Sequence, residues 1–280
     1  MGETSLFWLR VAVGLYSLGL LDAIITVLRG RESLFRIAHG AFGLGAILHL
    51  VSIVEQGVAA HRFPANGVFE SLSLGAWVIA TAFLGIYWRY KAESLSVFVF
   101  PLVFVMTLVA ALRNAAGQVA KVIPFPASAP PHGWLDAHIV LALLAYAALL
   151  FTAISAVAYL LQERQLKQKR KPGVSFYRLF PPLGTLDELI SRSLGAGFVL
   201  ITVSIIIGSV WSYIQVGSQW IDSGLIATAF VTWGIYLALI FFRVSAGWRG
   251  RKAAILAIVA LCCSAITWIA HAQLERHLLQ

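Results

Sequence analysis

The sequence predicts an all-α polytopic membrane protein with about eight transmembrane helices, and three observations support that fold class. The chain of 280 residues is 60% hydrophobic and only 12% charged, which is too apolar for a soluble domain. Its apolar residues gather in runs of about 20, the length that crosses the hydrocarbon core of a bilayer. Its basic residues are concentrated in every second connection between these runs. We therefore expect a single transmembrane domain over residues 1–280.

Eight apolar segments are expected to be helices, because lipid offers no partner for backbone polar groups and the period-two alternation of a β-barrel is absent. They are residues 6–28, 37–57, 67–87, 95–112, 137–161, 193–214, 223–242 and 253–272. The first is not expected to be a cleavable signal, since Glu3 precedes it and no small-residue cleavage site follows. Cys262 and Cys263 are adjacent in the last segment, which favours packing thiols over a disulfide or zinc site.

The distribution of the basic residues predicts the orientation. Of the 21 basic residues, 16 follow the first, third, fifth or seventh segment: Arg29, Arg31, Arg36, Arg89, Lys91, Arg164, Lys167, Lys169, Arg170, Lys171, Arg178, Arg192, Arg243, Arg249, Arg251 and Lys252. The positive-inside rule places these connections in the cytoplasm, so both termini face the outer, periplasmic side of a bacterial plasma membrane. The net charge of +9 then reflects topology and contact with membrane lipids, and no nucleic-acid partner is expected.

The connections themselves carry little chemistry. The inner connection, residues 162–192, begins with a basic run and continues with an aromatic and acidic part that is expected to lie along the inner interface. The outer connection, residues 113–136, is rich in Pro, Ala and Gly and is expected to form an irregular cap over the outer face.

The histidines are the side chains best suited to chemistry, and most of them are expected near the outer surface. Imidazole is the commonest metal ligand and a frequent axial ligand of haem iron. A haem site needs an imidazole on each face, apolar or aromatic walls, and a cation near the propionates. The candidates for these parts are His138, His277, Trp211, Trp220 and Arg62 or Arg113. The ordinary alternative is a belt of interfacial Trp and His.

Four blocks of the sequence resemble the cytochrome c assembly family, the CcsA/ResC type of haem-handling membrane protein with its HemX-like relatives. They are "HRFPANGVFESLSLGAW" (61–77), "GWLDAHIVLALLAYAALL" (133–150), the run from Ser191 to Trp233, and "GWRGRKAA" (247–254). Within the long run the matching positions are Arg192, Gly197, Phe198, Thr202, Gly208, Trp211, Gly217, Trp220, Thr232 and Trp233. The likeness covers roughly residues 40–277.

The resemblance implies roles for individual residues. His138 matches the first external axial ligand of haem, His277 the second, with His271 as the alternative, and Trp220 matches a tryptophan of the haem-platform loop. The implied cofactor is b-type haem, held non-covalently at the outer face and offered to apocytochrome c, whose thiols add to the vinyl groups. A CcsB/ResB-type membrane partner is implied as well. The chain is at most one component of a haem-attachment system, and His138 and His277 are expected to approach each other.

The sequence also departs from the family. Positions where the family carries loop tryptophans or a membrane histidine hold other residues: Val216, Asp222, Thr228 and Phe241. His49 remains in the second segment, either as a functional group or as a packed neutral imidazole. These departures predict weak haem binding and leave two alternatives open. One is a HemX-type regulatory membrane protein of haem biosynthesis, and the other a degenerate, haem-free scaffold subunit of a larger membrane complex.

Overall fold

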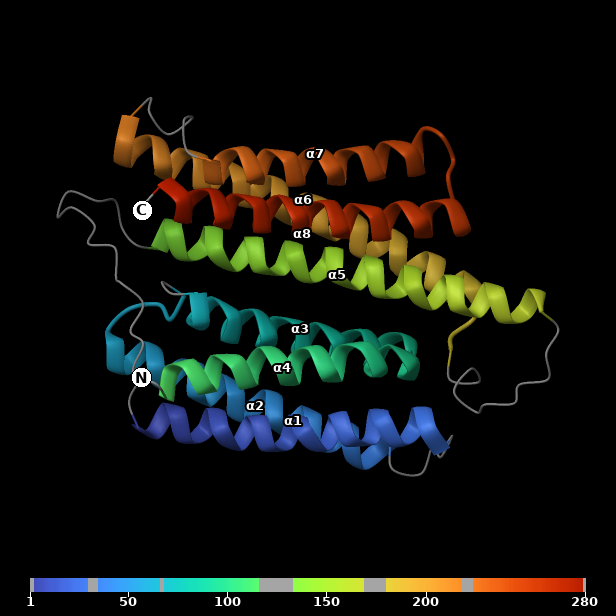
Figure 1. Ribbon diagram of the computed structural model, residues 1–280, viewed down its shortest axis with the longest axis horizontal. Helices are drawn as coiled ribbons and strands as arrows, with labels where there is room; N and C mark the ends of the chain where they lie inside the picture. Colours follow the sequence, from blue (N-terminus) through green and yellow to red (C-terminus); the bar gives the residue numbers. More distant parts are fainter. Residues whose placement is uncertain are drawn as a thin grey trace. The chain divides into compact units, whose positions relative to one another are not determined.

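The computed structural model describes residues 3–29, 35–65, 68–115, 133–168, 180–217 and 224–278, without the side chains of residues 26–29, 113–115, 215–216, 224–225 and 267–278. Over these ranges the chain is helical, with no strand, which confirms the all-α prediction (Figure 1). The elements are α1 (Glu3–Arg29), α2 (Phe35–Ala60), α3 (Val68–Tyr90), the short 3-10 helix η1 (Glu93–Leu95), α4 (Ser96–Ala115), α5 (Gly133–Lys167), α6 (Leu183–Val216), α7 (Gly224–Val244) and α8 (Arg251–Leu278).

Seven helices, α1 to α7, are long and apolar enough over their described residues to cross a membrane, so the chain is a multi-pass membrane protein. The sixth helix begins ten residues earlier than expected, because Leu183 to Arg192 continue α6 and do not form a separate interfacial segment. Pro182 precedes its first turn, and the carbonyl oxygen of Pro182 accepts bonds from Thr185 and Leu186 at 2.9 and 3.2 Å. With 34 residues, α6 is about 50 Å long and exceeds the hydrocarbon core.

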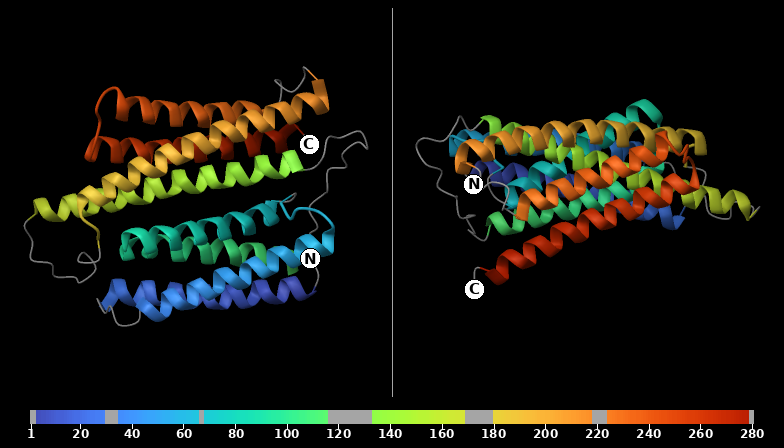
Figure 2. Two further views of the ribbon diagram at one scale, coloured as in Figure 1. Left: turned by 180° about the vertical axis from the view of Figure 1, so that it is seen from behind. Right: turned by 90° about the horizontal axis from the view of Figure 1, so that it is seen from above.

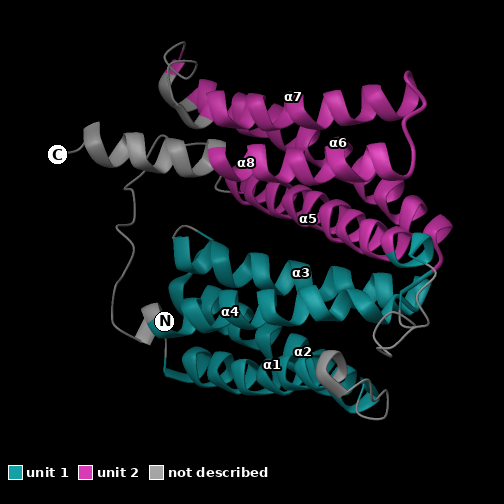
Figure 3. Ribbon diagram, turned by 45° about the vertical axis from the view of Figure 1, so that its right-hand side comes forward, with its two compact units in different colours: residues 1–124, 165–181 teal, residues 125–164, 182–280 magenta. Residues whose placement is uncertain are grey.

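The helices fall into two compact units, whose boundary passes through the last turn of α5 (Figure 3). Unit 1 takes in residues 1–124 and 165–181 and contains α1 to α4, while unit 2 takes in residues 125–164 and 182–280 and contains α5 to α8. The sequence has no internal repeat that would predict this division into two units. In each unit we call the end at which odd-numbered helices finish the inner end, and the opposite end the outer end.

In unit 1, α1 packs against α2 and α4, and α3 packs against the same two helices, so that the four run side by side (Figure 2). Their centre is aromatic: Tyr16, Phe42, Phe83 and Phe100 are fully buried. The rings of Phe42 and Phe100 stack with centroids 4.2 Å apart. A glycine at position 45 admits the Tyr16 ring, which would lie 3.0 Å from an added Cβ atom. Small residues at the contact permit this close approach of transmembrane helices.

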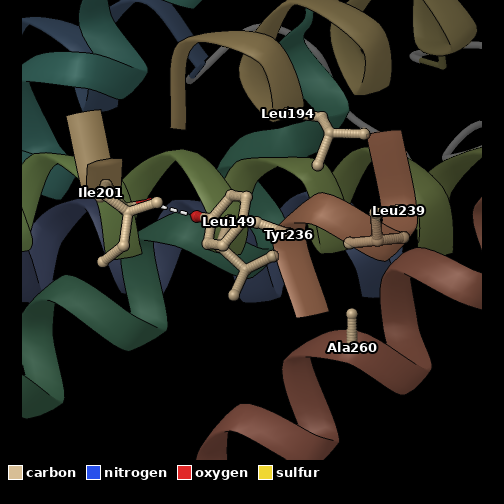
Figure 4. Packing of buried hydrophobic residues seen from close by; sticks show 7 residues of the cluster. Leu149, Leu194, Ile201, Tyr236, Leu239 and Ala260 are labelled. Carbon is tan, nitrogen blue, oxygen red and sulfur yellow. Dashed lines mark hydrogen bonds between the residues drawn. The ribbon is translucent and has the colours of Figure 1, made fainter. Parts of the chain in front are cut away.

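Unit 2 is organised around Tyr236 of α7. The ring lies among buried residues of all four helices of the unit: Ala145, Leu149, Leu194, Ile201, Leu239 and Ala260 (Figure 4). Its hydroxyl group donates a hydrogen bond to the carbonyl oxygen of Ala145. A Cβ atom at Gly197 would lie 2.8 Å from the ring, so this glycine is required for the packing.

Three helix ends show how the sequence stops its helices. α2 ends before His61 and α3 before Lys91, which adopt φ of 49° and 52°, and α6 ends before Gly217 at φ 64°. A residue with positive φ after the last turn is a common helix stop, and glycine adopts it without steric cost. The N–H group of Gly217 bonds to the carbonyl oxygen of Tyr213. Gly217, one of the glycines in the matched motif, thus has a conformational role.

Candidate functional site

The best-defined candidate ligand is His138, near the outer end of α5. Its Nδ1 atom lies 2.7 Å from the carbonyl oxygen of Ser204 on α6. The Ser204 hydroxyl oxygen is 3.1 Å from the same nitrogen and donates a 3.0 Å hydrogen bond to the His138 carbonyl. A carbonyl oxygen can only accept, so Nδ1 carries the hydrogen and Nε2 of the neutral ring carries the lone pair. A bond of this kind at one nitrogen orients the other toward a metal.

Gly208 makes this contact possible. A Cβ atom at position 208 would lie 2.5 Å from Nδ1 of His138, a distance that no side chain could keep without moving the ring. Gly208 follows Ser204 by four residues, so both lie on one face of α6. Trp211, partly buried, comes one turn later on that face, toward the outer end of unit 2.

Other residues of the matched motif fix α7 against α6. Trp233 donates a hydrogen bond from Nε1 to the hydroxyl oxygen of Thr202 at 3.0 Å. Thr202 in turn donates to the carbonyl oxygen of Phe198 at 2.7 Å, and the Phe198 ring stacks on Trp233 with centroids 6.0 Å apart. These contacts set the helix positions behind His138, so the motif residues serve packing as well as any ligand.

The remaining residues of the expected site are less fully placed. Trp220 lies outside the described residues, and His271 and His277 lie in α8, whose side chains are not described there. α5 and α8 nevertheless share a core, since Ala156, Ala254 and Ala257 belong to one buried cluster near their inner ends. The approach of His138 to His277 stays a prediction.

His49 lies in unit 1 and is fully buried. Its Nε2 atom is 2.8 Å from the hydroxyl oxygen of Ser73, and its Nδ1 atom is 3.4 Å from that of Tyr16. Both ring nitrogens therefore have hydrogen-bond partners within unit 1. This is the geometry of a packed imidazole, the second of the two alternatives stated for this residue.

Arg62, at the outer end of unit 1, is also engaged. Its two terminal nitrogens each lie 2.8 Å from a carboxylate oxygen of Glu70, and Gln56 donates to Glu70 at 3.0 Å. The hydrogen bonds to Glu70 raise the pKa of the Arg62 guanidinium above its usual value. The charge expected to meet a haem propionate is thus already opposed by a carboxylate. The side chain of Arg113, the other candidate, lies outside the described residues.

The donor set suits haem better than a bare metal ion. Among the described side chains no group of three or more His, Cys, Asp or Glu could hold an ion. His138 instead offers one ring nitrogen, and a single imidazole nitrogen is a frequent ligand of haem iron. The residues present fit haem in this respect.

Sequence reasoning missed the partners of these side chains. Ser204, which fixes His138, and Glu70, which pairs with Arg62, were not expected, and neither were Ser73 and Tyr16 beside His49. One signal was present for Ser204, because it shares a helix face with the matched Gly208. Partners in other helices had no comparable signal.

The long apolar helices define a polytopic membrane protein. One of its imidazoles is held by a neighbouring helix through one ring nitrogen, so the other nitrogen is able to act as a ligand. The family described as Cytochrome C assembly protein matches residues 66–276, most of the chain. The protein therefore belongs to the cytochrome c assembly protein family, and the resemblance is confirmed.

Individual relatives agree with this assignment. A protein of Guillardia theta named cytochrome c biogenesis protein CcsA is 27% identical, and the match covers 86% of this chain and 82% of that protein. A protein of the same name from Microcystis aeruginosa is 28% identical over 71% of this chain and 73% of its own length. One from Prochlorococcus marinus strain MIT 9301 is 26% identical over 83% and 81%. These names give no support to the HemX-type alternative.

Proposed function

We propose that this chain holds haem at the outer end of unit 2 and presents it to apocytochrome c during cytochrome c biogenesis. Family membership and the names of the relatives support the process. The observation that carries the proposal is the 2.7 Å contact between His138 Nδ1 and the Ser204 carbonyl, which leaves Nε2 with its lone pair.

The residues of the chain supply position and orientation. His138 would hold haem through Nε2, with His277, or His271 in its place, as the second ligand. Trp211 and Trp220 would line the haem, which when bound would supply the vinyl groups that accept the thiols of the apocytochrome. We do not include His49 and Arg62 in this site, since Ser73 and Tyr16 lie beside the ring nitrogens of His49 and Glu70 pairs with Arg62. A CcsB/ResB-type partner in the bacterial plasma membrane completes the system.

The test is a haem titration of the purified protein, followed by absorbance and electron paramagnetic resonance. The wild type is expected to give the low-spin signature of two imidazole ligands. His138→Ala is expected to lose that signature, and added imidazole is expected to restore it by taking the vacated position. The matched control is His61→Asn, which removes an exposed histidine expected at the outer surface. Asparagine is chosen because it tolerates the positive φ of that position.

Two outcomes contradict the proposal. If His138→Ala keeps the wild-type spectrum, His138 is not the ligand. If the wild type binds no haem at all, the haem-free scaffold alternative replaces the proposed function.

The predicted orientation has its own test. After Cys262 and Cys263 are replaced by Ala, single cysteines are introduced at 216–221 or 168–172. An impermeant thiol reagent applied from outside should label the first set and miss the second. The reverse pattern would place His138 at the cytoplasmic face and exclude delivery to an exported apocytochrome.

A further inference from the structure

A group of polar side chains at the inner end of unit 1 lacks partners. Asp22 on α1 is 5% exposed, His39 on α2 is 8% exposed, and Ser94 of η1 is fully buried. Among the described residues neither carboxylate oxygen of Asp22, nor Nε2 of His39, nor the hydroxyl group of Ser94 has a hydrogen-bond partner. Buried polar groups in native proteins are nearly always satisfied. These three side chains therefore require a small hydrogen-bonding ligand.

The three side chains all lie on the inner side of one aromatic level of unit 1. A Cβ atom at Gly19 of α1 would lie 3.1 Å from the Phe100 ring and 3.4 Å from the Phe42 ring, so these residues mark a common level of α1, α2 and α4. One turn closer to the inner end, α1 carries Asp22 and α2 carries His39. In the same direction α4 gives way to η1 and Ser94.

The orientation of His39 defines what it can bind. Its Nδ1 atom lies 3.1 Å from the carbonyl oxygen of Phe35 and must donate to it, so Nε2 is an acceptor. The ring is enclosed by Phe35 and Tyr87, with centroids 3.9 and 4.2 Å away, and by Phe100 at 5.3 Å. The unpartnered atoms of Asp22, His39 and Ser94 are thus mainly acceptors, so the ligand must donate hydrogen bonds.

No described cation forms an ion pair with Asp22, and an isolated carboxylate is costly to bury in a membrane interior. The nearby cations point elsewhere: Arg36 and Arg89 are exposed, and Lys91 sits over the Tyr87 ring at 5.4 Å. Among the described side chains, the titratable or charged groups at the inner ends of the surrounding elements are His39 and Arg36 on α2, Tyr87, Arg89 and Tyr90 on α3, Lys91, and Glu93 of η1. The side chain of Arg29, at the inner end of α1, is not described.

We propose that Asp22 and His39 form a proton-binding site at the inner end of unit 1, in which a water held by Ser94 bridges the carboxyl group to Nε2 of His39. One proton enters from the inner aqueous phase and forms an O–H bond on Asp22, which cancels the negative charge. The water then has the three polar partners typical of a buried site. The site shares no residue with the proposed haem site and stands independently of it.

Infrared difference spectra of the haem-free protein, recorded between acid and alkaline pH, test the proposal. The wild type is expected to show the stretching band of a buried protonated carboxyl group. Asp22→Asn is expected to lose that band and one titrating proton per chain, measured with a pH indicator. His39→Asn keeps a donor near Nδ1 but removes the Nε2 acceptor, so it is expected to shift the band without abolishing it. The matched control is Asp187→Asn, which alters a carboxylate already paired with Arg243 at 2.9 Å.

The outcomes decide between a proton and its competitors. A band that persists in Asp22→Asn, or no such band in the wild type, overturns the proposal. Dependence of the band on sodium, potassium or ammonium at fixed pH overturns it as well and assigns the site to a cation. Helicity measured by circular dichroism shows whether each variant is folded, and if Asp22→Asn is not, an unshifted band in folded His39→Asn is the contrary result.

Discussion

Two histidines, one in each unit, show what separates a packed imidazole from a candidate ligand. His49 in unit 1 places each ring nitrogen beside a hydroxyl group, those of Ser73 and Tyr16. His138 in unit 2 has its contacts at Nδ1, where the Ser204 carbonyl oxygen accepts its hydrogen at 2.7 Å. Both residues lie in apolar helices, so residue type and location alone do not distinguish them. The two histidines differ in whether the second ring nitrogen is hydrogen-bonded within the described part of the chain.

The same contrast extends to the residues of the matched blocks. In unit 1, Glu70 binds Arg62, Ser73 binds His49, and Trp77 donates to the carbonyl oxygen of Ala46 at 3.1 Å. These contacts join α3 to α2 and to the turn between them. In unit 2, Gly208 makes room for the His138 imidazole, and Ser204 holds it through Nδ1. One block therefore stabilises a helix pair, and the other holds the imidazole that we propose as a ligand.

The largest effect on the candidate site is expected for Gly208→Ala. The added methyl group would overlap the His138 ring, so the ring must turn away from Ser204. Haem affinity should fall about 10- to 100-fold, as when outer-shell partners of metal ligands are removed. The measurement is a haem titration followed by absorbance. Gly195→Ala on the same helix is the control, because its added Cβ atom meets nothing within 4 Å. Equal loss in both variants would contradict the account of Gly208.

His49→Ala should have the opposite profile. Ser73 and Tyr16 would lose a buried partner, at a cost of about 1–3 kcal/mol in the free energy of unfolding. The haem spectrum should stay unchanged, because both nitrogens are already used within unit 1. Denaturant titration and the spectrum together check this. A lost or altered haem signature would make His49 a ligand and end the contrast between the two histidines.

Glu70→Gln removes the carboxylate that opposes Arg62. The side chains are 29% and 14% exposed for Arg62 and Glu70, so the pair is only partly screened by solvent. We expect a loss of about 1–2 kcal/mol in the free energy of unfolding and no change in haem affinity. If the affinity rises instead, the released guanidinium has found a propionate, and Arg62 belongs to the haem site.

Ser204→Ala should have the smallest effect. The substitution removes the hydroxyl group but keeps the backbone carbonyl that accepts from Nδ1. We expect haem affinity to fall only about two- to fivefold, the equivalent of one modest hydrogen bond. The same titration checks this. A loss as large as that of Gly208→Ala would show that the hydroxyl, and not the carbonyl, orients His138.

Much of the fold followed from the sequence for one reason, that a membrane dictates both helix length and apolar composition. All eight segments are helices, and the main error concerned residues 183–192, where polar residues continue α6 beyond the expected span. His138 and Gly208 could be named because they lie in matched blocks. Their mutual contact could not, since pairing between α5 and α6 depends on how two helices rotate against each other. The acidic partner of Arg62, eight residues away across a turn, was hidden for the same reason.

The acceptor that fixes His138 is a main-chain atom, and this has a consequence for genetics. Every residue that could replace Ser204 brings the same carbonyl oxygen. Single substitutions at position 204 would therefore hardly change the contact that orients His138. The contact becomes visible only through position 208, where any side chain blocks access to it. Among natural sequences, selection for this contact would therefore conserve the glycine at position 208. The main-chain acceptor would impose no residue type at position 204.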